Sequence, residues 1–449
     1  MKRIVASIGL VAVGASSIQA GVMPGLTTET GKPWSVSATL RGFYDDNPSG
    51  IPNNYSTPGY KRSNSGFEVS PSFQVSLPMD QTSLSFGYVY SLKYYEHKLW
   101  NEDDNYDQTH DFNFGLTHAF SERYQLSIRD SFVIGQEPDI LRYGNSFPTF
   151  RRVSGDNLRN YGEINLLAQL TPKFGVEVGY ANTFYSYADD DPMYNGLGTN
   201  PQNLLWPSYS GLLDQLDHRA HIEGRYQIMP QTIGILGYQF RQTDYIGDQV
   251  IGYDVSRNAA IKSKMRNARS HYAYAGLTHN FRPDLTGALQ VGARYTEYYN
   301  NPASQDDWSP YVTASLQYTY LPESYLRFGA TYDYSSTYTW SPIEAGDITL
   351  NGQTFDVFVA LQHRITPKLY GNVNAEFVNV TYYGGTYDNR DSQYYLVGLN
   401  LQYRFTPNFS AEIGYNYDLS DNEYSGDVFG TTKYHYDRNR VYIGVTASY

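Results

Sequence analysis

Apolar and polar residues alternate along this chain in runs of about ten residues, which recur from residue 34 to the C-terminus. In the run 67–77, for example, Phe67 and Val69 alternate with Glu68 and Ser70. A period of two is typical of β-strands, in which successive side chains point to opposite faces of the sheet. The pattern therefore predicts strands that each have one apolar and one polar side.

The runs predict about 18 strands, with 16 as the alternative count. Each run is near the ~9–11 residues that a tilted strand needs to cross a bilayer, and an even count is typical of bacterial barrels. The expected strands cover residues 34–44, 66–77, 83–93, 109–120, 124–135, 160–170, 174–187, 217–228, 232–245, 270–281, 286–298, 311–320, 325–338, 354–365, 368–382, 394–405, 409–419 and 434–449.

Short turns and long loops alternate between these strands. The short turns share a corner that usually contains proline, as in Thr171-Pro172, Thr366-Pro367 and Thr406-Pro407. This asymmetry predicts an all-β, transmembrane, antiparallel up-and-down β-barrel with short periplasmic turns and long extracellular loops. The expected loops are rich in Asp, Asn, Gly and Tyr and cover residues 45–61, 95–107, 136–157, 188–214, 246–269, 299–309, 341–352, 384–393 and 420–433.

The N-terminal segment has the pattern of a secretory signal peptide. Lys2 and Arg3 precede an apolar stretch over 4–14, and small residues follow up to Ala20. We expect a signal peptide over 1–20, a short periplasmic segment over 21–33 and the barrel over 34–449, with cleavage after Ala15 as an alternative. These features predict a protein of the bacterial outer membrane.

Composition narrows the chemistry. The 449 residues include no Cys, which excludes disulfides, thiolate metal sites and thiol catalysis. Aromatic residues make up 16% of the chain, with 46 Tyr, as expected for strands that end at membrane interfaces. The net charge of −12 argues against a nucleic-acid partner.

The polar side of the strands carries charges of both signs, and we expect it to line the lumen. These residues either pair across strands and hold the wall together or form a hydrogen-bonding surface for polar solutes. If this side faces water, Arg225→Ile and Arg404→Ile should fold nearly normally. The expected lumen residues are Arg41, Glu68, Lys93, Glu163, Glu177, Arg219, Glu223, Arg225, Arg241, Arg294, Arg327, Asp333, Arg364, Glu376, Arg404 and Glu412.

The apolar side has two notable features. Near six of the short turns it carries Tyr or His, which predicts a girdle at the periplasmic membrane interface. Asp130 also falls on this side, and it predicts a bulge, a register change or a position covered by protein. The girdle residues are His118, Tyr226, His279, Tyr318, His363 and Tyr403.

The C-terminus has the pattern Gly-x-x-apolar-x-aromatic in Gly444, Ala447 and Tyr449. This pattern resembles the signal by which the barrel-assembly machinery recognises outer-membrane barrels. Together with the signal peptide, the Tyr-rich strands and the Thr-Pro corners, it makes residues 34–449 resemble bacterial outer-membrane barrels of the β-barrel porin type 2 group. The resemblance implies a porin-like or export channel and supplies no binding residues.

Motifs for catalysis are missing from the sequence. It contains no P-loop, no H-E-x-x-H and no G-x-S-x-G, so we predict no enzyme, no cofactor and no catalytic or metal-binding residue. The acidic runs 102–104, 189–191 and 306–307 are either solvated loop residues or sites where divalent ions bridge lipopolysaccharide.

The leading functional hypothesis is an unplugged outer-membrane channel for passive passage of small polar solutes, because the segment 21–33 is too short to fill a lumen. The alternatives are an exopolysaccharide export port and a non-conducting adhesive or structural barrel. A loop 188–214 or 246–269 folded into the lumen would favour the non-conducting barrel. Expected partners are outer-membrane lipid and lipopolysaccharide, and alternation alone leaves a homo-oligomer open.

Overall fold

The computed structural model describes the barrel wall and parts of its loops. The described residues are 32–50, 53, 62–97, 104–136, 156–194, 199–254, 257–301, 306–336, 349, 351–384, 388–422 and 434–449. The expected signal peptide and nearly all of the segment 21–33 lie outside them.

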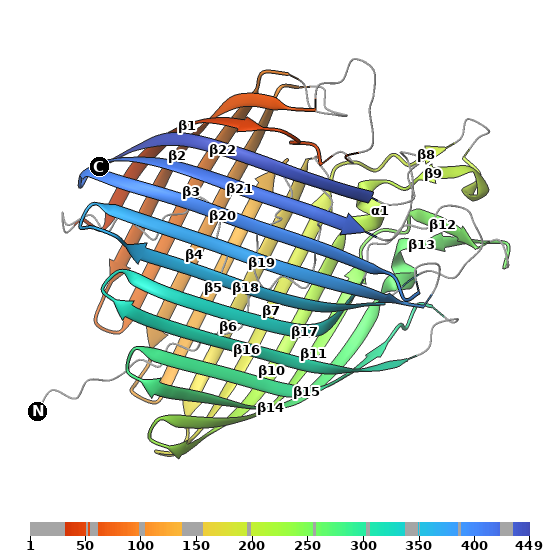
Figure 1. Ribbon diagram of the computed structural model, residues 1–449. Helices are drawn as coiled ribbons and strands as arrows, with labels where there is room; N and C mark the ends of the chain where they lie inside the picture. Colours follow the sequence, from red (N-terminus) through yellow and green to blue (C-terminus); the bar gives the residue numbers. More distant parts are fainter. Residues whose placement is uncertain are drawn as a thin grey trace, which may run out of the picture.

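Eighteen antiparallel strands form one sheet that closes on itself (Figure 1), because β1 pairs with β2 on one side and with β22 on the other. Closure leaves no edge strand in this sheet. The wall strands are β1 (Trp34–Asp45), β2 (Asn64–Pro78), β3 (Thr82–Tyr95), β4 (Tyr106–Ala119), β5 (Tyr124–Gly135), β6 (Asn157–Gln169), β7 (Phe174–Tyr187), β10 (Gln215–Met229), β11 (Thr232–Tyr245), β14 (Ala268–Arg282), β15 (Leu285–Glu297), β16 (Asp307–Leu321), β17 (Ser324–Ser336), β18 (Asn351–Arg364), β19 (Leu369–Tyr383), β20 (Asp391–Thr406), β21 (Phe409–Asn422) and β22 (Tyr434–Ser448).

The predicted fold class is confirmed, and each expected strand is present. Several strands extend further at the loop end than the apolar alternation indicates. β4 begins at Tyr106 and β20 at Asp391. The backbone ladder continues there through polar residues, because backbone hydrogen bonds do not require apolar side chains.

The Thr-Pro corners have a local cause. Thr171 Oγ1 accepts a hydrogen bond of 3.0 Å from the backbone N–H of Phe174, and Thr366 Oγ1 accepts one of 3.0 Å from Leu369. The proline after each threonine fixes φ near the value that the second position of a turn needs. Both residues therefore promote the same tight turn between neighbouring strands.

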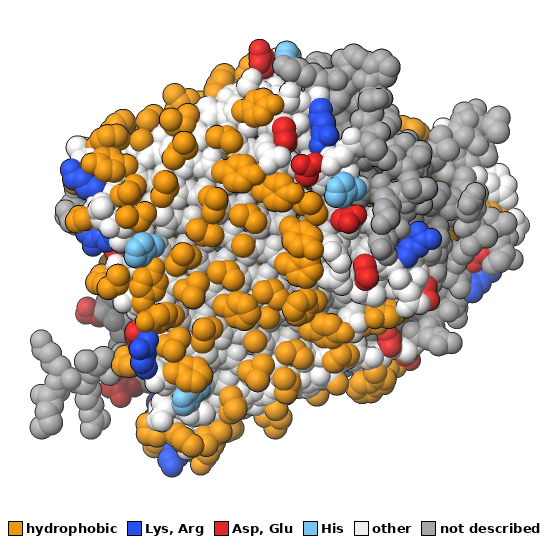
Figure 2. Space-filling model, viewed as in Figure 1, with side chains coloured by type: hydrophobic (Ala, Val, Ile, Leu, Met, Phe, Trp, Pro, Cys, Tyr) orange, Lys and Arg blue, Asp and Glu red, His pale blue; other side chains and the backbone are white. Residues whose placement is uncertain are grey.

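The two faces of the wall differ sharply in exposure and chemistry. Outward side chains are apolar and open, such as Leu236 at 71% and Ile443 at 64% exposure, whereas the inward Arg241 is 3% exposed. Figure 2 shows apolar side chains over the outer wall on the side of β14–β22, with charged side chains gathered toward its ends. No helix among the described residues is long and apolar enough to span a membrane.

Inward glycines make room for inward aromatic rings. Gly237 lies directly opposite Tyr274, and Gly414 lies directly opposite Tyr442 in the sheet register. A Cβ atom at either glycine would overlap the opposing ring. The missing side chain therefore lets each tyrosine lie flat against the wall.

The strands around Asp130 are regular. The pairings of β5 with β4 and with β6 run without a register shift, and Asp130 pairs with Phe114 and Gly162. The prediction of a bulge or register change at Asp130 is therefore wrong. The carboxylate stays on the outward, apolar side, which leaves coverage by protein as the remaining expectation.

Two long loops carry folded elements that the sequence patterns did not predict. The connection between β7 and β10 contains β8 (Met193–Tyr194), η1 (Pro201–Asn203), β9 (Leu204–Trp206) and α1 (Tyr209–Leu213). The connection between β11 and β14 contains β12 (Val250–Asp254), β13 (Ala259–Lys262) and η2 (Ser263–Arg266). We call these elements together the loop-end cap, and Figure 1 shows them at the end of the barrel away from the short turns.

Candidate functional site

The inner wall is a continuous polar surface because each strand sends every second side chain inward. All of the residues expected on the lumen side lie on this inward parity of their strands. The structure groups many of them into four hydrogen-bonded networks, which span strands that are far apart in sequence.

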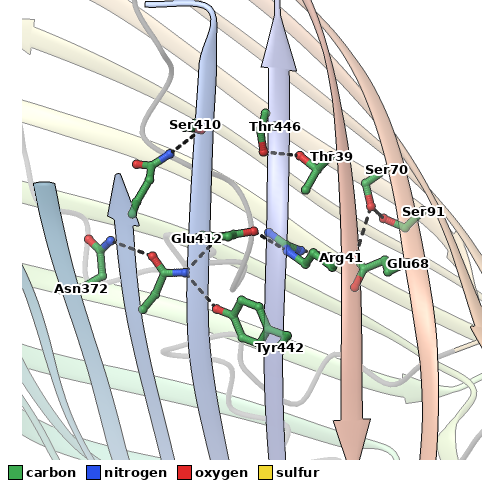
Figure 3. A network of polar contacts seen from close by, with 12 residues as sticks. Thr39, Arg41, Glu68, Ser70, Ser91, Asn372, Ser410, Glu412, Tyr442 and Thr446 are labelled. Carbon is green, nitrogen blue, oxygen red and sulfur yellow. Dashed lines mark hydrogen bonds and ion pairs between the residues drawn. The ribbon is translucent and has the colours of Figure 1, made fainter. Parts of the chain in front are cut away.

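The first network joins the two ends of the chain (Figure 3). Arg41 Nε donates to Glu412 Oε1 at 2.6 Å, and Arg41 Nη1 lies 3.4 Å from Glu68 Oε1. Arg440 reaches the other oxygen of Glu68 at 3.3 Å, and Asn400 donates to Glu412 at 2.9 Å. Strands β1, β2, β20, β21 and β22 are thus tied together at the point of closure.

The second network lies on β7, β10 and β14. Arg225 Nη1 donates to Glu177 Oε2 at 2.6 Å, and His221 Nε2 lies 3.7 Å from the other oxygen of Glu177. On the same stretch of wall, the Tyr274 hydroxyl donates to Glu223 Oε1 at 2.9 Å. Glu177 and Arg225 are 4% and 7% exposed, so this pair is largely removed from water.

The third and fourth networks lie nearer the loop end. Arg241 Nε donates to Asp217 Oδ2 at 2.6 Å, and Arg219 lies 3.3 Å from the other oxygen. Arg294 lies 3.4 Å from Asp333 and donates to the backbone carbonyl of Tyr334. The Tyr272 hydroxyl also donates to Asp333, at 3.3 Å. Positive and negative groups therefore lie side by side on the wall.

The remaining expected lumen residues have more local contacts. Glu376 lies beside Asp356 on the neighbouring strand, and Lys93 lies opposite Glu68 in register. Glu163 accepts a hydrogen bond from Asn165. Arg364 lies 3.1 Å from Glu323 at a short turn. Two more arginines lie over tyrosine rings, Arg327 over Tyr325 at 4.9 Å and Arg404 over Tyr370 at 4.2 Å.

Sequence reasoning missed one of the most buried ion pairs. Arg438, 2% exposed, donates to both carboxylate oxygens of Asp45 and to Asp418 at the loop end of the wall. Arg438 and Asp45 lie at opposite ends of the sequence, and barrel closure brings them together. Asp45 was expected in a loop, so only the sheet register could have revealed this contact.

The loop-end cap packs against the inner wall. Leu212, Leu213, Ile251 and Ile261 form one buried cluster with two inward tyrosines of β7, Tyr185 and Tyr187. Because these tyrosines are on the same parity as Glu177, the cap covers the inner face at the loop end of β7. The cap therefore occupies part of the barrel mouth.

Arg266 joins the two loops of the cap. Its guanidinium is buried, donates to the carbonyls of Gly211 at 2.8 Å and Leu212 at 3.0 Å, and lies 3.6 Å from the ring centre of Tyr245. Burial lowers the pKa of this guanidinium. The carbonyls belong to α1, so one side chain of the β11–β14 loop holds the helix of the β7–β10 loop.

Asp214 ends α1 at the junction with the wall. Its Oδ1 accepts a hydrogen bond of 2.6 Å from the backbone N–H of Tyr187. Partial burial, with the nearby charge of Asp190 adding to it, raises the pKa of the Asp214 carboxyl to about 6. By contrast, salt bridges from Lys262 and Lys264 lower the pKa of the exposed Asp248.

The expected girdle residues all lie on the outward parity near the short turns. His118 and His279 each hydrogen-bond a threonine hydroxyl, at 2.7 and 2.8 Å, and each packs edge-on against a phenylalanine. His363 bonds the Tyr320 hydroxyl at 2.8 Å, and Tyr318 lies close to that same tyrosine. Tyr226 and Tyr403 are exposed on the outer surface.

A second outward belt lies near the loop end and was not predicted. It consists of three tyrosine–histidine pairs on neighbouring strands, each joined by a hydrogen bond from 2.7 to 2.9 Å. The sequence signal for this belt was the Tyr and His residues on the outward side of the strands, which lie away from the short-turn corners that predicted the first belt. The pairs are Tyr88 with His110, Tyr180 with His218, and Tyr238 with His271.

The residues of the C-terminal pattern lie in the closing strand pair. Gly444 is opposite Arg41, and Ala447 is opposite Ala38. Tyr449 exchanges backbone hydrogen bonds with Val36 at 2.9 and 3.1 Å, and its exposed ring lies 3.6 Å below the Lys32 ammonium. The recognition of this strand by the assembly machinery stays a prediction.

Two of the acidic runs lie wholly within the described residues. Asp189, Asp190 and Asp191 precede β8, and Asp306 and Asp307 lie at the start of β16, whereas most of 102–104 lies outside the description. Over the described parts of the chain, no three His, Asp or Glu side chains gather closely enough to hold a metal ion.

Comparison with solved structures shows barrels of the outer membrane. The chain is similar to OccAB4 of Acinetobacter baumannii, at 11% identity and a TM-score of 0.41, covering 93% of this chain and 99% of that one. It is similar to the outer-membrane protein OpdK of Pseudomonas aeruginosa at 12% identity and a TM-score of 0.41, with the same coverage. It also resembles a ferric enterobactin receptor from Pseudomonas aeruginosa, at 10% identity and a TM-score of 0.42, covering 92% of this chain and 80% of that one.

These similarities extend to the barrel architecture alone. No protein-family model and no curated protein matches the sequence. The resemblance to the β-barrel porin type 2 group therefore stays a prediction.

Proposed function

We propose that this protein is a channel of the bacterial outer membrane through which small polar solutes pass passively. The observation that carries the proposal is the contrast between the two faces of the closed barrel, with an apolar outer wall and a charged inner wall on the same strands. An apolar outer wall suits lipid, and a barrel of this size normally encloses an aqueous channel.

The paired charges of the inner wall favour neutral or dipolar solutes. Arg225 with Glu177 and Arg241 with Asp217 place opposite charges side by side at 2.6 Å. Such a wall offers donors and acceptors without a strong field of one sign. An export port for a charged polysaccharide would need a wall dominated by one sign, so these pairs do not favour that alternative.

The loop-end cap supports a second candidate, a non-conducting adhesive barrel. The cap occupies part of the mouth, and Arg266 fastens its two loops together. We infer that the cap narrows the channel. If it closed the lumen completely, the long loops would instead present a surface for binding a polymer or another cell.

Conductance in planar bilayers separates these functions. We expect stable openings from the purified protein, and sugar uptake into vesicles that contain it. Wild-type protein without openings, together with openings in a variant whose residues 247–266 are replaced by a short Gly-Ser linker, would identify the cap as a closed gate. If neither protein conducts, the channel proposal is wrong and the adhesive barrel is favoured.

Membrane location and assembly belong to the same proposal. The two belts of Tyr and His support this location, because such side chains favour the interfaces between a membrane and water, and we expect them to contact outer-membrane lipid and lipopolysaccharide. The closing strand with Tyr449 would be recognised by the barrel-assembly machinery. Deletion of Tyr449 should then reduce the heat-modifiable, protease-resistant form in the outer membrane, whereas normal assembly of this truncation would refute the role of Tyr449.

A further inference from the structure

Charges of both signs line the inner wall, but the two signs differ in their access to water. Most inward carboxylates are buried, and no inward carboxylate on the described strands is more than partly exposed. The inward arginines reach further, since Arg219 and Arg404 are partly exposed and Arg129 is exposed. Six inward carboxylates have exposed fractions from 1% to 9%, namely Glu68, Asp111, Glu177, Asp217, Glu223 and Glu412.

Side-chain length explains this difference. Asp217 accepts a hydrogen bond of 2.6 Å from Arg241 Nε and lies 3.3 Å from Arg219 Nε. The short Asp217 side chain holds its carboxylate close to the backbone, whereas the longer arginine extends past it toward the lumen. The Arg219 side chain is accordingly 29% exposed, and that of Asp217 is 2% exposed. This ion pair therefore presents its positive member to the water.

Arg129 on β5 is exposed on the inward side and has no partner within the described part of the chain. It makes no hydrogen bond, ion pair or ring contact there. Its register partner on β6, Glu163, instead accepts a hydrogen bond from Asn165. The charge of the Arg129 guanidinium is therefore not cancelled by a neighbouring carboxylate.

Two further inward arginines lie over tyrosine rings and form no ion pair with a carboxylate among the described residues. Arg327 on β17 lies 4.9 Å from the ring centre of Tyr325, and Arg404 on β20 lies 4.2 Å from that of Tyr370. Both arginines are partly exposed. A cation–π contact leaves the net charge of a guanidinium in place, whereas an ion pair cancels it. We call Arg129, Arg327 and Arg404 the turn-side arginines.

The turn-side arginines lie in the half of the wall near the short turns. Arg129 and Arg327 are among the first six residues of β5 and β17, which begin at short turns. Arg404 is among the last three residues of β20, which ends at a short turn. The loop-end cap lies at the opposite end of the barrel (Figure 1). A solute that enters past the cap therefore meets three guanidinium groups that no carboxylate neutralises.

We propose that the turn-side arginines make the channel selective for small organic anions with a carboxylate group over cations of the same size. The inward ion pairs largely cancel, and the other inward carboxylates are mostly buried, so the turn-side arginines set the sign of the field along the water-filled path. A low-dielectric wall strengthens such a field, and arginines that line a pore favour anions. The planar guanidinium also matches a carboxylate, which can accept two parallel hydrogen bonds from it.

This selectivity rests on the proposed channel, so the test separates the two. Uptake into vesicles that contain the protein is compared for glucose, gluconate and glucosamine, which are similar in size and differ in charge. Glucose uptake reports the channel itself, and we expect gluconate to enter at least about twofold faster than glucosamine. Glucose uptake with equal rates for gluconate and glucosamine would overturn the selectivity alone. No uptake of any probe would overturn the channel and its selectivity together.

Removal of the Arg129 charge tests the source of the selectivity. Reversal potentials in a KCl gradient give the ratio of anion to cation permeability. Arg129→Gln should lower this ratio roughly two- to fivefold, the effect of one unit charge several Å from an ion in water. Arg129→Lys keeps the charge and should keep the ratio. Because Arg129 has no contact to lose within the described part of the chain, both variants should assemble like the wild type.

Arg269→Gln is the matched control. Arg269 is exposed on the outward side of β14 and lies over Tyr299 at 4.3 Å, so this variant removes the same charge from the outside of the barrel. The permeability ratio should stay at the wild-type value. An equal shift in Arg269→Gln, or no shift in Arg129→Gln, would overturn the assignment of selectivity to the turn-side arginines. A shift in Arg129→Lys as large as that in Arg129→Gln would also contradict it, because the charge is then not the cause.

Discussion

The inner and outer walls of this barrel are made by the same strands, yet they are stabilised in different ways. Outward residues such as Ile222 and Leu399 are apolar and exposed, whereas inward residues such as Arg225 and Glu177 are buried in ion pairs. The side of the wall, and not the strand, therefore decides what a substitution does. A charge added outside and a charge removed inside should both be harmful, for different reasons.

The largest expected effect follows removal of one partner from a buried inner pair. Arg225→Ile leaves Glu177 with only His221 beside it, so we expect a loss of about 3–5 kcal/mol in unfolding free energy. This replaces the sequence-based expectation that Arg225→Ile folds nearly normally. Urea unfolding of the protein in lipid vesicles measures the loss.

The matched control removes both charges. Arg225→Ile combined with Glu177→Leu removes both charges of the pair, so the double variant should recover most of the lost stability. If the double variant is as unstable as Arg225→Ile, the instability comes from packing and not from the orphaned carboxylate.

A charge placed on the outer wall should have the next largest effect. Ile222→Arg or Leu399→Arg puts a guanidinium into the apolar band, at about 2–4 kcal/mol near its middle. The same urea titration in vesicles serves as the measurement. Unchanged stability in both variants would mean that this face is not in contact with lipid.

Arg404 sharpens the comparison because this inner arginine forms no ion pair with a carboxylate in the described part of the chain. It is half-buried and lies over Tyr370. Arg404→Ile should cost about 0.5–1 kcal/mol, the size of a lost cation–π contact, and should shift the channel toward cations. Reversal potentials across a salt gradient report the shift, and an unchanged potential would place Arg404 outside the conduction path.

The cap provides a smaller test on the loop side. Arg266→Ser leaves two carbonyls of α1 without their donor, so the cap should loosen by about 1–3 kcal/mol and channel openings should become more frequent. Lys264→Ser is the control, because it removes the same charge from an exposed side chain of the same segment. Equal effects of the two variants would show that charge alone matters.

Acid pH should tighten the cap slightly. The pKa of the Asp214 carboxyl is raised to about 6 in the folded cap, so the folded cap binds a proton more tightly than the unfolded chain does. Protonation of Asp214 therefore stabilises the folded cap, and this stabilisation is lost as pH rises from about 4 through 6. Proteolysis of the cap should therefore be slower at pH 5 than at pH 7.5, and Asp214→Asn should remove the difference. A difference that survives in Asp214→Asn would assign the pH effect to another group.

The sequence predicts the strands better than the cap for a physical reason. Strand residues such as those of β7 and β11 alternate over fourteen positions, so the pattern is long and regular. The helix α1 has five residues and begins at Tyr209, and the hydroxyl of the preceding Ser208 caps it by accepting from the Gly211 N–H at 3.1 Å. So short an element is stabilised mainly by its contacts with Tyr187 and Arg266, which no local pattern reveals.

The sequence predicts which residues face the inside of the barrel, but it does not predict which of them form ion pairs. Alternation alone identifies Arg41 and Glu412 as residues of the same side. Their 2.6 Å contact exists because β22 closes the barrel against β1, and that register depends on the whole sheet. The contact of Arg438 with Asp45 depends on the same closure of the barrel. At Asp130 the local pattern was misleading, because a polar residue on the apolar side predicted a bulge or register change and the register there is regular.

The accessibility of single cysteines in lipid nanodiscs tests the central claim, that water fills the inside of this barrel and lipid surrounds the outside. Both barrel ends are open to solvent in a nanodisc, so a membrane-impermeant maleimide can reach the lumen from either side. Arg129→Cys, at an exposed inward position, and Arg404→Cys, at a partly exposed inward position, should react, and Ile222→Cys and Leu399→Cys should not. Reaction at positions 222 and 399 with protection at 129 and 404 would mean that the faces are inverted and that the apolar wall does not face lipid.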